Sequence, residues 1–339
     1  MDVKSLPRSG LISLKENLPL DTPLSVHIDP TNGCNFKCSF CPTGDPALLK
    51  EKGRKVANLK LTEFQKIIDD MKDFPRPVKS LLLYKDGEPL LCRDLGRMIK
   101  YAKQCEVAET IAVTTNASLL TLDRSIELID AGLDAIRISV EHVSDDGYKN
   151  VTRTFANYET IVNNVALLYA EKTKRQSSIN VHAKIVDVGL SDQEKKKFMS
   201  DFSPITDSTN IDTIMGWSNN TDRDWTLAQS VSTAMDGITQ IKKSRKVCPS
   251  PFKTLAVNSN GNVSLCCVDW SHETSIGNAF ETPLADLWNS PQLREFRLQH
   301  LRGNRCDINV CSQCQYIEGM PGSSDLDSDV DRLVECFSE

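Results

Sequence analysis

Three cysteines, Cys34, Cys38 and Cys41, stand in a C-x3-C-x2-C pattern early in the chain. With 12 cysteines in 339 residues, chance alone would place about 0.015 such patterns in a chain of this length. Three thiolates on one short loop leave a tetrahedral zinc site without its fourth ligand. They suit a 4Fe–4S cluster in which one iron stays open for a chelating cofactor. We therefore expect an iron–sulfur site here, with structural zinc as the alternative.

Four more cysteines form a second set, C-x17-C-x44-C-x2-C, at Cys248, Cys266, Cys311 and Cys314. Residues 257–263 are typical of a β-hairpin with an Asn-Gly turn. Such a hairpin followed by a Cys-x2-Cys pair would bring four thiolates together, which satisfies either zinc or an iron–sulfur cluster. Taken alone, the pattern slightly favours zinc.

Composition limits the class of protein. Lys and Arg number 40 against 46 Asp and Glu, so the net charge is −6, which argues against a nucleic-acid binder because such a protein needs a basic face. No apolar run approaches the roughly 18 residues of a membrane span, and the N-terminus lacks the apolar centre of a signal peptide. We expect a cytoplasmic protein, without a membrane partner, whose cysteines bind metal instead of forming disulfides.

Short β-rich runs and amphipathic segments alternate between residues 24 and 216, and they must position the first cysteine set. The predicted strands are Leu24–Asp29, Val78–Tyr84, Thr110–Thr115, Ala135–Val140, Ile179–Val186 and Ile211–Met215. The predicted helices are Leu61–Met71, Asp94–Cys105, Leu122–Ala131, Tyr158–Ala170 and Ser191–Ser200. Six β-then-α units predict an α/β fold with a parallel sheet, too short for a closed eight-stranded barrel. An open barrel and a doubly wound sheet both fit.

The alternation of β-rich runs and amphipathic segments ends after residue 216. We expect an N-terminal extension at 1–23, an α/β domain at 24–216, a linker at 217–247, a small cysteine-rich domain at 248–320 and a tail at 321–339. The main helical signal of the cysteine-rich part is Leu284–Leu301. The Ser/Asp-rich tail is expected to be mobile, unless the segment from Leu333 to Phe337 docks.

The first cysteine loop, with aromatic Phe40 before its last cysteine, resembles that of the radical SAM superfamily. The resemblance implies a partial (β/α)6 barrel over residues 24–216, with chemistry at the carboxyl ends of its strands. In that family the open iron binds the amino and carboxylate groups of S-adenosylmethionine (SAM), and one-electron reduction gives a 5′-deoxyadenosyl radical. An external reductant such as flavodoxin or ferredoxin is an implied partner.

Residues after the next strands agree with this resemblance. Lys85-Asp86-Gly87-Glu88-Pro89 is similar to the family's Gly-Gly-Glu-Pro motif, with Asp86 in place of the first glycine. That departure is mild if the backbone supplies the contact, because Gly87 keeps the close approach. Asn116 ends the third strand and Ser139 ends the fourth, where relatives contact the ribose or carboxylate of SAM. The implied cofactor-binding residues are Cys34, Cys38, Cys41, Phe40, Gly87, Glu88, Asn116 and Ser139.

The second cysteine set resembles the SPASM extension of radical SAM enzymes. The full SPASM pattern has seven cysteines and two auxiliary clusters, but its downstream cysteines are missing after Cys314. The resemblance therefore implies the shortened twitch version, in which Cys248, Cys266, Cys311 and Cys314 hold one auxiliary 4Fe–4S cluster. Cys306 and Cys336 remain as possible remnants of a second cluster, and Cys92 and Cys105 are expected to be inert thiols.

The resemblance implies an enzyme that abstracts hydrogen from an unactivated C–H bond. We expect a small polar substrate, such as a sugar, a cyclitol or an aminoglycoside-like molecule, since the first 23 residues are too short for a leader-peptide-binding domain. Dehydrogenation is slightly favoured over epimerisation, because the second cysteine pattern is most similar to that of twitch alcohol dehydrogenases. The alternatives are a peptide (RiPP) maturase or epimerase and, more distantly, a non-catalytic iron–sulfur electron-transfer protein.

Candidate catalytic residues are polar groups expected near the mouth of the barrel. Glu141, Arg153 and Lys184 follow or lie within the fourth and fifth strands, and Trp217 and Asp269 are further candidates. For each of these a solvated surface role is equally compatible with the sequence. Cys267, next to Cys266, is interpreted as an alternative ligand, a hydrogen-atom donor or a packed thiol.

Overall fold

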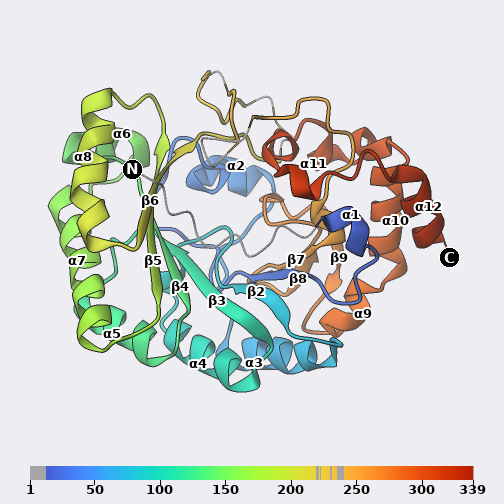
Figure 1. Cartoon of the computed structure of the whole chain (residues 1–339), viewed down its shortest axis with the longest axis horizontal. Helices are drawn as coiled ribbons and strands as arrows, with labels where there is room; N and C mark the ends of the chain where they lie inside the picture. Colours follow the sequence, from blue (N-terminus) through green and yellow to red (C-terminus); the bar gives the residue numbers. More distant parts are fainter. Residues whose placement is uncertain (1–12, 219–220, 222, 230, 235–239, 339) are drawn as a thin grey trace.

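The computed structural model describes residues 13–338 except 219–220, 222, 230 and 235–239. Within these residues the centre of the molecule is a nine-stranded sheet in the order β6-β5-β4-β3-β2-β1-β7-β8-β9 (Figure 1). The strands are β1 Ser25–Ile28, β2 Val78–Leu82, β3 Ala108–Thr115, β4 Ala135–Val140, β5 Asn180–Asp187, β6 Ser208–Thr213, β7 Thr254–Val257, β8 Asn262–Ser264 and β9 Ser275–Asn278.

Strands β1 to β6 are the six predicted β-runs, and all of them pair in parallel without closing into a barrel. β4 has the predicted bounds, whereas β6 begins at Ser208, three residues before the predicted start. The early residues of β6 are polar and give no hydrophobic signal, but they pair with β5 from His182 onward. The α/β prediction with an open parallel sheet is confirmed.

Helices cover one face of this sheet, as Figure 1 shows for α3, α4, α5, α7 and α8. The helices are α1 Leu14–Asn17, α2 Pro46–Glu51, α3 Leu61–Asp70, α4 Leu95–Cys105, α5 Leu122–Asp130, α6 Asp145–Thr152, α7 Tyr158–Lys174, α8 Asp192–Phe202, α9 Leu284–Trp288, α10 Pro291–Leu301, α11 Asn309–Ser312 and α12 Val330–Ser338. Side chains alternate along β4, so Ile136 and Ile138 are buried while Arg137 and Ser139 remain partly accessible on the other face. The core therefore lies on the helix side, and the inner face is free to carry polar groups.

The cysteine-rich part continues the same sheet. β7 pairs in parallel with β1, and β7 and β8 form the predicted hairpin with antiparallel pairing. Its turn places Gly261 at φ 86°, and a Cβ there would lie 2.5 Å from Asn278 Oδ1. Glycine is the residue that this turn accepts.

The helical signal at 284–301 corresponds to helix, but not to one continuous helix. The structure contains two helices, α9 and α10, separated at Asn289 and Ser290. The Ser290 hydroxyl accepts a hydrogen bond from Leu293 N at 3.2 Å, and Pro291 occupies the first helical position. Proline has no N–H to donate to a preceding turn, so it starts a helix and interrupts a longer one.

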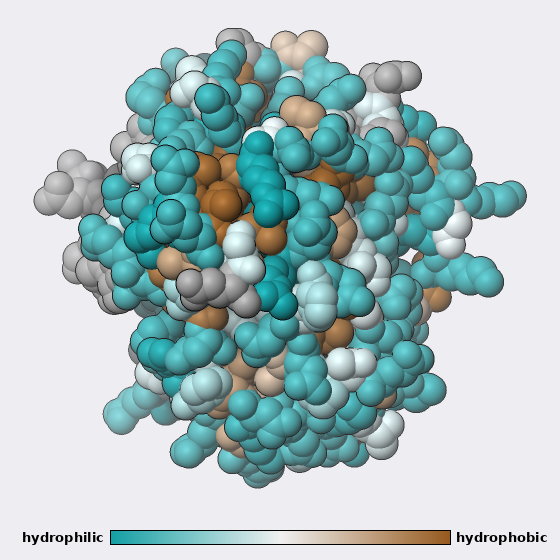
Figure 2. All heavy atoms as spheres, turned by 90° about the vertical axis from the view of Figure 1, so that its right-hand side faces the viewer, coloured by the Kyte–Doolittle hydropathy of each residue, from teal (hydrophilic) through white to brown (hydrophobic). Residues whose placement is uncertain are grey.

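The end of the chain packs onto its beginning. Leu333 and Phe337 of α12 are buried in a small core with Leu14 of α1 and Phe252, so the docking alternative for this segment holds. Figure 2 shows the side of the molecule that carries α10 and α12 in Figure 1. This side presents mostly hydrophilic residues, with small hydrophobic areas between them. Among the described residues no helix has the length and apolarity to cross a membrane.

Two phenylalanines provide a matched test of this core. Phe64 of α3 is 0% exposed, whereas Phe155 is 76% exposed. We expect Phe64→Ala to lower the free energy of unfolding by about 3–5 kcal/mol because it leaves a cavity. Phe155→Ala should change it by less than about 0.5 kcal/mol. Denaturant titration of both variants measures the difference, and equal losses would contradict the packing described here.

Candidate functional site

The first cysteine loop connects β1 to α2 at the carboxyl end of the parallel strands. Buried Phe36 anchors it, with its ring edge-on to Tyr148 of α6 at a centroid distance of 6.1 Å. The main-chain N–H groups of Lys37 and Ser39 donate to carbonyl oxygens in the last turn of α6, at 2.9 and 2.8 Å. The loop that carries the three cysteines is thereby fixed against the fold.

The three thiols of this loop differ in exposure, since Cys34 is exposed while Cys38 and Cys41 are half-buried. Loss of contact with water raises the pKa of all three, to about 12 for Cys34, and the charge of Cys41 also raises the pKa of Cys34 and Cys38. In the part of the chain that the structure describes, no three Cys, His, Asp or Glu side chains converge as they would around a single metal ion. The donor set fits a larger iron–sulfur cluster, whose iron would stabilise the deprotonated thiolates.

The Gly87–Glu88 segment packs directly against this loop. A Cβ on Gly87 would lie 2.1 Å from the carbonyl oxygen of Thr31, so only glycine fits. The Glu88 carboxylate is buried and accepts hydrogen bonds from Thr115 Oγ1 at 2.6 Å and from Asn116 N at 2.8 Å. Glu88 thus ties the end of β3 to the cysteine loop.

Asn116 extends this connection. Its side-chain amide donates to Asn35 Oδ1 at 2.9 Å, next to Cys34. The predicted residues Gly87, Glu88 and Asn116 are therefore brought together around the first cysteines. Glu88 and Asn116 both make hydrogen bonds within the protein that fix the shape of this edge.

The fourth and fifth strands bring further predicted residues to the inner face. Ser139 lies opposite Lys184 in the register of β4 and β5, and Lys184 forms an ion pair with Asp212 of β6 at 3.0 Å. Glu141 is 9% exposed, and burial raises its pKa to about 7, an effect that the Lys184 charge partly opposes. The charge of Lys184 therefore reaches Glu141, as expected if both side chains lie on the inner face of the sheet.

Arg153 lies at the end of α6 in a left-handed conformation with φ 52°. It lines a cavity of about 290 Å³ together with Cys38 and Cys41. Trp217 approaches the same loop, because its indole N–H donates to the carbonyl oxygen of Phe40 at 3.0 Å. Arg153 and Phe40 are thus placed at the first cysteine site.

The second cysteine set also comes together. Cys248, Cys266, Cys311 and Cys314 line one small cavity of about 20 Å³. Burial and the negative charge of Cys248 together raise the pKa of Cys314 to about 12. Four thiols around one small cavity are the ligand set that a 4Fe–4S cluster requires.

Sequence reasoning missed His300, which lines this second cavity. It is 1% exposed, and among the described residues neither ring nitrogen has a hydrogen-bond partner. Burial lowers its pKa to about 4, so the ring is neutral near pH 7. A histidine within the cysteine-rich segment was the only available signal, and its position in α10 gave no reason to link it to the cysteines.

Cys267 does not line the four-cysteine cavity in the described structure. Burial raises its pKa to about 11, while the nearby Lys85 charge lowers it. The thiol is therefore close enough to feel the charges of Lys85 and Asp86 as well as that of Cys248. Asp269 is buried, and its carboxylate accepts hydrogen bonds from Thr274 N at 2.9 Å and Thr274 Oγ1 at 2.6 Å, so it shapes the loop after Cys267.

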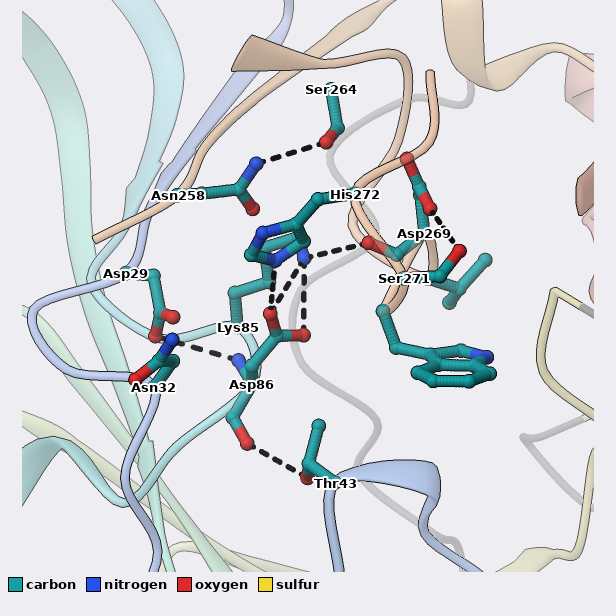
Figure 3. A network of polar contacts seen from close by, with 12 residues as sticks. Asp29, Asn32, Thr43, Lys85, Asp86, Asn258, Ser264, Asp269, Ser271 and His272 are labelled. Atoms are coloured by element: carbon teal, nitrogen blue, oxygen red, sulfur yellow. Dashed lines mark hydrogen bonds and ion pairs between the residues drawn. The ribbon is translucent and has the colours of Figure 1, made fainter. Parts of the chain in front are cut away.

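Asp86, the predicted departure from the family motif, has surroundings that the sequence did not indicate. Figure 3 shows its carboxylate facing Lys85 and His272. Its side chain is completely buried. The substitution of glycine by aspartate therefore adds a buried charge between the two cysteine sites.

Comparison with known proteins agrees with this geometry. The profile of the Radical SAM superfamily matches residues 28–191, and that of the SPASM iron–sulfur cluster-binding domain matches residues 248–315. GTP 3',8-cyclase of Clostridium botulinum is 27% identical over 128 residues, which cover 38% of this chain and 38% of that protein. GTP 3',8-cyclase of Staphylococcus saprophyticus is 27% identical over 173 residues, or 50% of this chain and 47% of that protein. The matched segments span less than half the length of these relatives.

Solved structures show the same fold at low sequence identity. SuiB of Streptococcus suis bound to S-adenosylmethionine has a TM-score of 0.65 and 16% identity, over 94% of this chain and 79% of that chain. BtrN in complex with AdoMet and 2-DOIA has a TM-score of 0.54 and 15% identity, over 86% and 92% of the two chains. Both families bind iron–sulfur clusters, and the radical SAM family binds SAM. This chain belongs to the radical SAM superfamily and carries a C-terminal SPASM domain.

Proposed function

We propose that this protein is a radical SAM oxidoreductase acting on a small polar substrate such as a sugar, a cyclitol or an aminoglycoside-like molecule. When bound, SAM and its cluster supply a 5′-deoxyadenosyl radical for hydrogen abstraction from an unactivated C–H bond. Cys34, Cys38 and Cys41 would hold this cluster, and the four-cysteine cavity would hold one auxiliary cluster. A flavodoxin or ferredoxin would deliver the electron, and the free thiols fit a reducing compartment such as the cytoplasm.

The proposed substrate class rests on the polar inner face of the sheet. Arg137 lies opposite His182 in the register of β4 and β5. The next residue of β5 on the same face is Lys184. It pairs with Asp212, whose carboxylate also accepts a hydrogen bond from Asn210 at 2.7 Å. A wall of charged, imidazole and amide groups suits a molecule with many hydrogen-bonding groups and does not suit an apolar one.

Glu141 is the best candidate for proton removal. Dehydrogenation of an alcohol carbon releases a proton and an electron after hydrogen abstraction, so the protein must supply a base and hold an electron acceptor. The pKa of Glu141 is raised to about 7, so both forms of the carboxyl are present near neutral pH. The four-cysteine cavity would hold the acceptor. Arg153 would contact the cofactor or the substrate, beside Cys38 and Cys41.

A second candidate function is that of a peptide (RiPP) maturase or epimerase. An open pocket of about 350 Å³ lies beside the cavity of Arg153 and shares Trp225 with it; its lining includes Trp217, Trp225, Gln313 and Gln315. Trp225 is 5% exposed, and its indole N–H has no acceptor among the described residues. Amide side chains and an unpaired donor suit a peptide main chain. SuiB has been solved with a precursor peptide and anSMEcpe with AdoMet and a peptide. A non-catalytic electron-transfer protein is the distant alternative.

Iron content and SAM cleavage test the assignment of the two sites. Anaerobically reconstituted protein should carry about eight irons and release 5′-deoxyadenosine from SAM under reduction. Replacing Cys34, Cys38 and Cys41 with alanine should leave about four irons and abolish the release. Replacing Cys311 and Cys314 should remove the other four and leave SAM cleavage possible. Cleavage that persists in the first variant would show that the sites are assigned wrongly, and no cleavage by the intact protein would favour the electron-transfer alternative.

A panel of cyclitols, aminocyclitols, sugars and synthetic peptides separates the two candidate functions. A polyol should stimulate 5′-deoxyadenosine release and be converted to a ketone without uptake of deuterium from deuterated water. Cys267→Ala should leave that conversion intact, as should the control Cys105→Ala. An inverted product that carries one solvent deuterium and is lost in Cys267→Ala would instead identify epimerisation with Cys267 as hydrogen-atom donor. Stimulation by peptides alone would favour the maturase.

The pH dependence of turnover tests Glu141. The carboxylate is the base, and it predominates above a pKa of about 7, so the rate should rise from pH 6 to pH 8 and then level off. Glu141→Gln should lower turnover of the stimulating polyol by about 100-fold or more and abolish this rise. Exposed Glu159→Gln serves as the control. A Glu141→Gln variant that keeps the wild-type pH profile would exclude Glu141 as the base.

A further inference from the structure

Asp86 is the centre of a buried group of charges at the junction of the barrel and the SPASM domain (Figure 3). Its side chain and that of Lys85 are both 0% exposed, and Lys85 Nζ lies 2.9 Å from Asp86 Oδ2. Arg54 Nη2 lies 3.0 Å and His272 Nε2 lies 2.7 Å from the same oxygen. We call Asp86, Lys85, Arg54 and His272 the Asp86 centre. Burying charges is costly, so such a group persists only where its contacts are nearly complete.

The Asp86 centre holds the loop that begins at the second cysteine site. Besides its contact with Asp86, Lys85 Nζ donates a hydrogen bond to the carbonyl oxygen of Asp269, at 3.0 Å. Arg54 donates to the carbonyl oxygen of Trp270. The main-chain N–H of Asp269 in turn donates to the carbonyl oxygen of Cys266 at 3.3 Å. Two basic side chains of the barrel thus fix the backbone that follows a predicted auxiliary ligand.

The same centre reaches the first cysteine site. Thr43 Oγ1 donates to the carbonyl oxygen of Asp86 at 2.9 Å and lies 3.0 Å from Cys41 Sγ. The Asp86 centre therefore contacts the first cysteine loop through Thr43, as it contacts the backbone after Cys266 through Lys85 and Arg54.

Positive charge exceeds negative charge in the Asp86 centre. Lys85 and Arg54 contribute two positive charges against the one carboxylate of Asp86. Asp29 Oδ1 accepts a hydrogen bond from the N–H of Asp86 at 3.4 Å, but burial and the Asp86 charge raise the pKa of Asp29 to about 8. Asp29 is therefore mainly neutral at pH 7 and does not cancel the excess. Protonation of His272 would only add to it.

We propose that the Asp86 centre positions the Cys266–Thr274 loop on the barrel and sets the reduction potentials of the clusters on its two sides. The proposal rests on the cluster assignments of the proposed function. A cluster gains negative charge when it is reduced, so a nearby buried positive charge favours the reduced form and raises the potential, and a negative charge lowers it. Lys85 and Arg54 thus raise the reduction potentials of the clusters, and the negative charge of Asp86 partly cancels this effect.

Substitutions of opposite charge test this role. In reconstituted full-length protein, redox titration followed by electron paramagnetic resonance measures the midpoint potential of each cluster. Lys85→Met should lower the potentials and Asp86→Asn should raise them. The double variant should return toward the wild-type values, because its net charge equals that of the wild type. Lys79→Met is the matched control, since Lys79 lies on β2, the strand that leads to Lys85, but is 59% exposed and paired with Glu109 at the surface.

The direction of these shifts distinguishes tuning from simple structural support. Loss of support would move the potentials of Lys85→Met and Asp86→Asn in the same direction, or not at all, and either result would overturn the proposal. If Lys85→Met takes up too little iron, Arg54→Gln removes another buried positive charge and must lower the potentials instead. Uptake of zinc in place of iron would overturn both this proposal and the proposed function. Opposite shifts in a protein that never cleaves SAM would reject the proposed function alone.

Discussion

The close contact between Gly87 and the start of the cysteine loop is the constraint on which the first site depends. Any side chain at position 87 would collide with main-chain oxygens of Thr31 and Gly33. This contact sets the distance between the ends of β1 and β2, and the hydrogen bonds of Glu88 then join the end of β3. Three strand ends and one loop are therefore assembled by main-chain contacts and one buried carboxylate, before any cofactor is considered.

The inner face of the sheet follows from strand alternation. Because every second side chain of β4 and β5 enters the helix-side core, the others must face inward, and here they are Arg137, Ser139, His182 and Lys184. Those charges are tolerable because the sheet stays open and Lys184 has an acidic partner on the next strand. An eight-stranded closed barrel would have to fill this interior with packed side chains. An open sheet does not have to be filled in this way.

The features that sequence predicted correctly are local ones. The six strands and the two cysteine sets were predicted from periodicity and spacing, and the Asn-Gly hairpin from turn chemistry. The prediction missed a local break in a helical pattern, because Ser290 and Pro291 divide one apparent helix. It also missed His300 and the Asp86 centre. Arg54, Asp86 and His272 are far apart in the sequence, and only the paired sheet brings them together. No spacing rule links such residues.

The pairing of β7 with β1 determines whether the SPASM domain can be separated from the rest of the chain. β1 is a central strand only because β7 covers one of its edges, with Ser25 N donating to Lys253 O at 3.1 Å and Asp29 N to Val257 O at 2.9 Å. A fragment cut before residue 248 would present β1 as a bare strand edge, with its N–H and C=O groups open to another chain. The SPASM domain is thus not a detachable module. Grafting it onto another barrel would require a matching free edge as well as a matching cysteine pattern.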